Sequence, residues 1–121
     1  MSKNMEISFL LDFYGDMLTE KQRSMVEYYY NEDLSLAEIA ENEGITRQGV
    51  RDSIKRAEAQ LLEMEERLSL AARFRRMQEE LLTVQENARM LRTVNDRNGR
   101  IPEIEECAAK IAAAADRMAE A

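Results

Sequence analysis

Apolar residues recur along this chain at steps of three and four, which is the period of an amphipathic helix. The first stripe consists of Ile7, Leu10, Leu11 and Tyr14. It predicts a short helix with one buried face, ending near Gly15, where the stripe stops. Similar stripes continue through most of the sequence, so the pattern predicts a chain of helices.

Two pairs of polar residues predict where the next helices begin. Thr19 is followed three positions later by Gln22, and Ser35 is followed by Glu38. Each pair is a capping box, in which the hydroxyl accepts from a backbone N–H while the longer side chain reaches back to the cap. The helix after Thr19 should stop near Asn31.

The helix after Ser35 has room for only two turns, because Gly44 offers the left-handed position that ends helices. Thr46 can then cap the following helix. Two capped helices separated by so tight a turn predict a helix-turn-helix. The residues expected to form its scaffold are Ile39, Ala40, Gly44, Ile45, Val50 and Ile54.

After Thr46, no strong helix breaker occurs before the segment 95–102. The apolar spacing has one irregular step, from Ala71 to Phe74, where two heptad-like blocks meet out of phase. This predicts either one long helix with a local change in winding or two helices bent near Ala71 and Ala72. The expected oligomer or partner stripe along it comprises Leu61, Met64, Leu68, Phe74, Met77, Leu81, Val84 and Leu91.

A last helix is predicted to begin near Pro102, after a turn at Asn98 and Gly99. One face of it carries Ile104, Cys107, Ala108, Ile111, Ala115 and Met118. This helix could fold back as an antiparallel hairpin or meet a second chain. Because it is too short to cover the whole stripe, the remainder favours a homodimer or another protein partner.

Composition supports an all-α fold class, since four glycines and one proline are too few for the turns of an all-β chain. We expect residues 1–58 to form the helix-turn-helix domain. Residues 59–121 are expected to form a long amphipathic helix and a C-terminal helical hairpin, used for oligomerisation or partner binding.

The same composition argues against an enzyme. Histidine is absent, so neither a Ser-His nor a Cys-His pair can be built, and mixed His and Cys zinc sites are excluded. Cys107 is the only cysteine, which favours the cytoplasm. We therefore expect no cofactor, metal or small-molecule substrate. The start of the chain lacks the features of a signal peptide, and no apolar run is long enough for membrane insertion.

Charge is distributed unevenly along the 121 residues, whose formal net charge is −7. Residues 1–45 hold three basic and ten acidic side chains, whereas residues 46–100 hold twelve and nine. The basic stretch opens in the second helix of the predicted helix-turn-helix, where base edges and phosphates are contacted in such motifs. The candidate nucleic-acid-binding residues are Thr46, Arg47, Gln48, Arg51, Lys55 and Arg56.

Residues 18–68 resemble region 4 of sigma factors, above all in the segments LTEKQ, SLAEIAE and TRQGV. The chain is more similar still to the bacterial YlxM family, over roughly residues 5 to 90. That resemblance implies a non-enzymatic cytosolic protein, encoded beside genes of the signal recognition particle and proposed to regulate or assist that pathway. Its partners would be DNA or the RNA or protein of the particle.

Two positions depart from the family pattern. Family members usually have a small residue such as alanine where Gly49 stands and an aromatic residue where Arg51 stands. Glycine lowers helix propensity by up to about 1 kcal/mol relative to alanine, while Arg51 favours an anionic partner. The alternative interpretation is a protein interaction module that keeps the helix-turn-helix fold without binding DNA.

Overall fold

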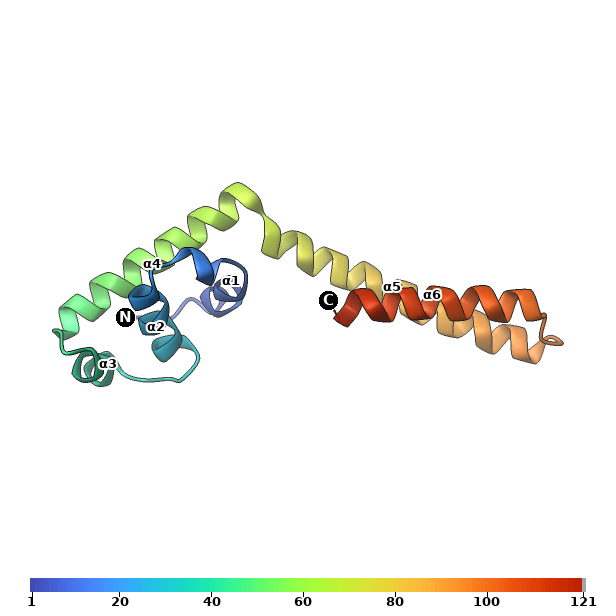
Figure 1. The fold of residues 1–121 in the computed structure, drawn as a ribbon, viewed down its shortest axis with the longest axis horizontal. Helices are drawn as coiled ribbons and strands as arrows, with labels where there is room; N and C mark the ends of the chain where they lie inside the picture. Colours follow the sequence, from blue (N-terminus) through green and yellow to red (C-terminus); the bar gives the residue numbers. More distant parts are fainter. Residues whose placement is uncertain (121) are drawn as a thin grey trace. The chain divides into compact units, whose positions relative to one another are not determined.

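The computed structural model describes residues 1–120, which contain six α-helices, one 3-10 helix and no strand (Figure 1). The elements in chain order are α1 (Glu6–Tyr14), the 3-10 helix η1 (Gly15–Met17), α2 (Glu20–Tyr30), α3 (Leu36–Glu43), α4 (Arg47–Leu68), α5 (Leu70–Arg97) and α6 (Pro102–Glu120). The predicted all-α fold class is confirmed.

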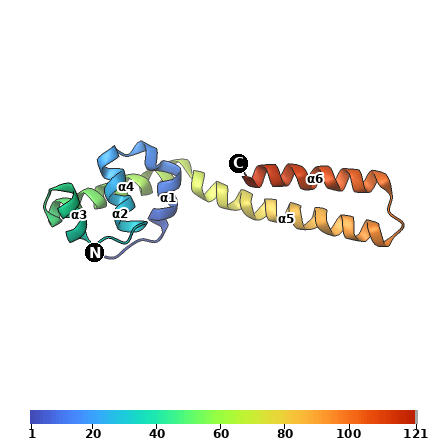
Figure 2. The ribbon, with the colours of Figure 1, turned by 60° about the horizontal axis from the view of Figure 1, so that its bottom comes forward.

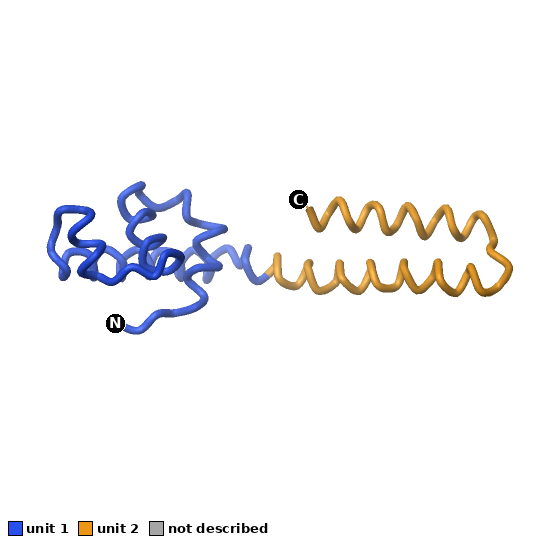
Figure 3. The backbone as a smooth tube through the Cα atoms, turned by 90° about the horizontal axis from the view of Figure 1, so that it is seen from below, with its two compact units in different colours: residues 1–72 blue, residues 73–121 orange. Residues whose placement is uncertain are grey.

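The chain divides into two compact units, residues 1–72 (unit 1) and residues 73–121 (unit 2), coloured separately in Figure 3. The boundary predicted after Glu58 falls inside α4, which continues without interruption to Leu68. The assignment of a separate oligomerisation or partner role to the C-terminal part stays a prediction.

The two capping boxes form as the sequence predicts. Thr19 Oγ1 accepts from the backbone N–H of Gln22 at 3.2 Å, and Ser35 Oγ accepts from that of Glu38 at 3.1 Å. In both, the N3 side chain accepts from the cap's own N–H, so two N–H groups without helical partners are satisfied at each end. The hydrogen bonds that the Glu38 carboxylate makes with Ser35 lower the pKa of that carboxyl.

Gly44 ends α3 in the left-handed conformation, with φ 66°. Thr46 follows in an extended conformation and caps α4, with its Oγ1 accepting from the Gly49 N–H at 2.9 Å. The predicted helix-turn-helix is therefore present as α3, the turn at Gly44, and the first half of α4.

The core of unit 1 lies along one face of α4, which contacts α1, α2 and α3. Figure 2 shows these three helices gathered along α4. Each buries its predicted apolar stripe against it, because a short amphipathic helix gains most of its stability from such packing. The buried residues of α4 are Val50, Ile54, Ala57 and Leu61.

The sequence left open whether the long apolar stripe belongs to one helix or two, and the structure has two. α4 ends at Ser69, whose φ of 55° is in the left-handed region that residues with a Cβ rarely adopt. The Glu65 carboxylate accepts from the backbone N–H groups of Ala71 and Ala72 at 3.1 and 3.0 Å. Glu65 thereby satisfies the start of α5 in the absence of a conventional cap.

Within unit 2, α5 and α6 lie side by side as an antiparallel hairpin (Figures 2 and 3). Pro102 occupies the first position of α6, as predicted. The connecting loop is organised by Asn95, which is the one buried polar residue among residues 1–120. Its side chain donates to the Ile101 carbonyl at 2.9 Å and accepts from the Ile101 N–H at 3.0 Å.

Candidate nucleic-acid interface

The six candidate nucleic-acid-binding residues lie at the cap of α4 or in its first three turns. All six are exposed on unit 1: Thr46, Arg47, Gln48, Arg51, Lys55 and Arg56. Because Val50 and Ile54 are fully buried, the opposite face of this segment is fixed in the core. The side chains of the exposed face are therefore presented on a rigid helix rather than on a loop.

The basic residues of this face are available to an outside partner. Arg47, Arg51 and Lys55 are four positions apart and so share one face of α4. Neither these three nor Arg56 forms an ion pair within the described part of the chain. By contrast, Arg23 pairs with both Asp16 and Glu27. An anion approaching α4 would displace no existing carboxylate partner from its arginines or lysine.

One carboxylate lies on the same face. Gln48 Nε2 donates to Asp52 Oδ1 at 3.0 Å, one helical turn further along. A Gln amide that reads an adenine needs both its donor and its acceptor, so Gln48 must release Asp52 before it can contact a base edge in that way. Asp52 also places a negative charge between the basic side chains.

A shallow hollow of about 300 Å³ is lined by Arg47, Gln48, Arg51 and the half-buried Leu36. Leu36 is the first residue of α3, so the hollow lies where the two helices of the motif meet. The sequence pattern did not single out Leu36 as a site residue, because an apolar residue directly after a capping serine is an ordinary helix start.

Four of the predicted scaffold residues lie in the core of unit 1. Ile39, Ala40, Val50 and Ile54 are buried in one cluster with Met25 and Tyr29 of α2. Ile45 is the exception, since 37% of its surface is exposed. Ile45 Cδ1 lies 3.7 Å from the position that a Cβ on Gly49 would take, so it covers the first turn of α4 instead of filling the wedge.

The predicted oligomer or partner stripe is not one continuous surface, which corrects part of the sequence interpretation. Leu61 is fully buried in unit 1, and Met64 packs against the same cluster, because α1 covers this part of α4. These two residues are therefore not open to a partner. Leu68 at the end of α4 is exposed, as are Phe74, Met77, Val84 and Leu91 on α5, while Leu81 is half-buried.

Two other kinds of site do not occur within residues 1–120. No helix among them combines the length and the apolar character needed to cross a lipid bilayer. No group of three or more Cys, Asp or Glu side chains in this range is placed so that it could hold a metal ion.

Comparison with known proteins identifies the family. The model of the family UPF0122, described as "Putative helix-turn-helix protein, YlxM / p13 like", matches residues 1–100. This chain belongs to that family. A UPF0122 protein of Halalkalibacterium halodurans is 48% identical over 86 residues, which are 71% of this chain and 79% of the relative. One from Clostridium botulinum is 42% identical over 98 residues, covering 81% and 90%.

The match to the UPF0122 model takes in unit 1 and α5 through its last residue, Arg97. It stops before α6, which begins at Pro102. The candidate interface on α4 thus lies inside the part of the chain that the YlxM/p13-like family describes, whereas the second helix of the unit 2 hairpin lies outside it.

Proposed function

We propose that this YlxM-like protein is a non-enzymatic, cytoplasmic regulatory or accessory protein that binds nucleic acid through the first three turns of α4. The observation that carries the proposal is the set of four exposed cations on one short helical segment, none with an intramolecular carboxylate partner among residues 1–120. Arginine can contact guanine or phosphate, and lysine suits phosphate.

Several local features support this use of α4. The backbone N–H groups of Arg47 and Gln48 belong to the first helical turn, where no carbonyl precedes them within the helix, so they can add to phosphate binding. Arg51 stands between Arg47 and Lys55 on the same face. We infer that the RNA of the signal recognition particle is one candidate polymer, on the family resemblance, and duplex DNA the other.

The affinity of unit 1 alone should be modest. It carries eight basic and fifteen acidic side chains, so most of its surface repels a polyanion. Four cations can make fewer than the roughly six to ten phosphate contacts that give strong salt dependence. A physiological complex would therefore need a second binding surface, a second copy or a protein partner.

The test is a titration of the full chain with labelled duplex DNA and, separately, with signal recognition particle RNA, at several salt concentrations. The variant Arg51→Ala/Lys55→Ala should bind at least about tenfold more weakly and show a shallower salt dependence, because a cation that no longer neutralises a phosphate reduces the slope by about one. Lys21→Ala/Arg67→Ala is the matched control, since it removes the same charge from unit 1 away from this face.

Equal weakening by the two double variants would mean that only net charge matters, which contradicts a site on α4. Absence of binding to either polymer at low salt would remove the proposal altogether. The second candidate function would then be favoured. It is a protein interaction module in which the acidic surface of unit 1 binds a basic protein. The fifteen acidic side chains of unit 1 favour that alternative.

A further inference from the structure

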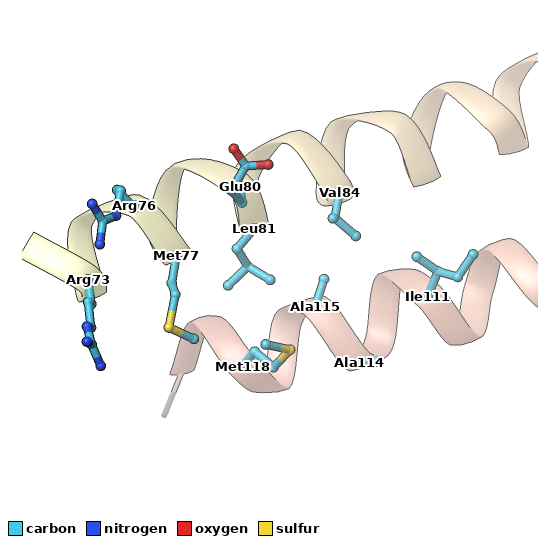
Figure 4. Close-up of a pocket in the computed structure, with 10 residues that line it drawn as sticks. All are labelled: Arg73, Arg76, Met77, Glu80, Leu81, Val84, Ile111, Ala114, Ala115 and Met118. Carbon is cyan, nitrogen blue, oxygen red and sulfur yellow. The ribbon is translucent and has the colours of Figure 1, made fainter.

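The hairpin of unit 2 has an apolar groove along one side. The groove encloses about 680 Å³ between α5 and α6 (Figure 4). Met77, Leu81 and Val84 line it from α5, and Ile111, Ala115 and Met118 line it from α6. Because both sets follow steps of three and four, each forms a continuous helical stripe. Figure 4 shows the two stripes turned toward the same space.

Polar side chains bridge α5 and α6 on a side outside the groove. Arg92 Nη2 donates to Glu105 Oε1 at 2.7 Å, and Gln85 Nε2 donates to Asp116 Oδ1 at 3.0 Å. Gln85 and Arg92 are seven positions apart and therefore lie on one face of α5. The two bridges close that side with hydrogen-bonded side chains. The groove side holds the apolar lining residues, although α5 also exposes Leu82 and Met90 outside the groove.

Unit 2 lacks a core of its own. Among its described residues, the buried ones are Ala88, Asn95, Ala108 and Ala115, and no large apolar side chain is fully buried. The groove residues stay open, with 59% of Met77, 43% of Val84 and 55% of Met118 exposed. Two helices that bury only alanines and Asn95 between them gain little hydrophobic stabilisation, whereas helices in proteins draw most of their stability from packing an apolar face. A further helical layer must cover the groove.

We propose that a second copy of this chain covers it, hairpin against hairpin, so that two copies of unit 2 form a four-helix bundle. Two antiparallel hairpins packed groove to groove, and related by a two-fold axis parallel or perpendicular to the bundle, place every neighbouring pair of helices antiparallel. That is the arrangement of up-down bundles. Leu91 lies seven residues after Val84, which lies seven after Met77, so the stripe continues beyond the pocket at the spacing of such interfaces.

Charge favours a second copy over a different protein. Unit 2 holds nine basic and nine acidic side chains, so its net charge is zero, and the whole −7 resides in unit 1. Like charges therefore do not oppose self-association of unit 2. The rim of the groove carries both signs, with Arg73 and Arg76 beside Glu80. A strongly acidic or strongly basic helix would meet its own sign there, whereas another copy of this mixed surface is balanced.

Sedimentation equilibrium of the full chain at micromolar concentrations tests the proposal. The expected mass is twice the 14.0 kDa of one chain. The variant Val84→Glu/Ile111→Glu should raise the dimer dissociation constant at least about a hundredfold, because it places charge on both walls of an apolar contact. Thr83→Glu/Ala113→Glu is the matched control: both residues are exposed, next to or near the groove residues in sequence but on other faces of the helices.

The groove variant could also unfold the hairpin itself. Thermal unfolding of the wild type, followed by far-UV circular dichroism, therefore provides an independent test of the dimer. A dimeric bundle should unfold at a temperature that rises with protein concentration. A fully helical wild-type monomer whose unfolding temperature does not change with concentration would overturn the proposal, as would a groove variant that remains dimeric. The Arg51→Ala/Lys55→Ala variant should stay dimeric, so a failure of nucleic-acid binding is separate from a failure of the dimer.

Discussion

The Tyr14 hydroxyl donates a hydrogen bond of 2.7 Å to the Glu65 carboxylate, 51 positions further along the chain. The same hydroxyl accepts from the Leu70 N–H at 3.1 Å. Tyr14 therefore ties α1 to both sides of the turn at Ser69. Its burial and the neighbouring Glu65 carboxylate raise the pKa of the Tyr14 hydroxyl, which widens the pH range over which it can donate.

Replacing this hydroxyl should destabilise unit 1. We expect Tyr14→Phe to lower the free energy of unfolding by about 1–3 kcal/mol, since a carboxylate loses a buried donor and the Leu70 N–H loses its acceptor. Tyr28→Phe is the control, because the hydroxyl of Tyr28 makes no hydrogen bond within residues 1–120. Urea denaturation of both variants measures the difference. Equal destabilisation by the two variants would show that the bond to Glu65 contributes nothing.

Gly49→Ala should make the protein more stable. A Cβ at this position would lie 3.1 Å from Thr46 Oγ1, so the capping bond must lengthen slightly. That length is tolerated elsewhere: Gln22 and Glu38 carry a Cβ at the equivalent position, with capping bonds of 3.2 and 3.1 Å against 2.9 Å at Gly49. The gain in helix propensity, up to about 1 kcal/mol, should therefore prevail.

Thermal and urea denaturation would measure the gain from Gly49→Ala, and the nucleic-acid titration should be unaffected because Gly49 presents no side chain to a partner. A lower stability would mean that Thr46 cannot move and that the cap outweighs the helix propensity. Gly44→Ala serves as the contrast. It should destabilise the protein, since the φ of 66° is unfavourable for any residue with a Cβ.

Alkaline pH should destabilise the fold partly through Tyr30. Burial, together with the hydrogen bond to Glu58, raises the pKa of Tyr30 to about 12 from its ordinary value of 10.0. Between these two values the unfolded chain has lost this proton while the folded chain keeps it, so the contribution of Tyr30 is complete below pH 10 and is lost as pH rises toward 12.

Unfolding free energies measured on either side of this window check the effect. Tyr30→Phe has no proton to lose, so its stability should fall less steeply with pH than that of the wild type. Both proteins keep the other tyrosines and lysines, whose titration is common to the two curves. Parallel curves would show that Tyr30 titrates alike in the folded and unfolded chains.

Asn95→Asp should weaken the hairpin of unit 2 in a pH-dependent way. At neutral pH the new carboxylate would set a charged oxygen where Asn95 Nδ2 now donates to the Ile101 carbonyl, 2.9 Å away. We expect a loss of about 1–3 kcal/mol, partly recovered near pH 4, where the carboxyl can donate again. Thermal unfolding at both pH values measures this. The control is Asn87→Asp on α5, whose Nδ2 donates to the Thr83 carbonyl at 2.8 Å at an exposed site. A similar response there would show that burial of the Asn95 bond contributes nothing.

Much of unit 1 could be predicted because its signals are local. A capping box involves only four consecutive residues, and a glycine such as Gly44 indicates a turn by itself. The caps at Ser35 and Thr46, and with them the helix-turn-helix, could therefore be predicted from residues adjacent in the sequence. The same holds for the exposure of Arg47 and Arg51, which follows from the apolar stripe that passes through Val50 between them.

The break at Ser69 could not be predicted as such, since no glycine, asparagine or proline marks it. The left-handed conformation there is held by Glu65 and by Tyr14, and a contact 51 positions apart leaves no local pattern. Which part of the apolar stripe is buried could not be predicted either, for a similar reason. Periodicity shows that Leu61 and Val84 each lie on an apolar face, but only the fold shows that α1 covers the first and leaves the second open.

The segregation of charge in unit 1 has a kinetic consequence. At low salt, where the Debye length is well above the roughly 10 Å it has at 0.1 M, a distant polyanion senses unit 1 mainly as a negatively charged body and is repelled. Attraction takes over only once the edge bearing Arg47, Arg51 and Lys55 is turned toward the polymer. Added salt should relieve the long-range repulsion while weakening the final contacts, so it should shorten the lifetime of a complex more than it slows its formation.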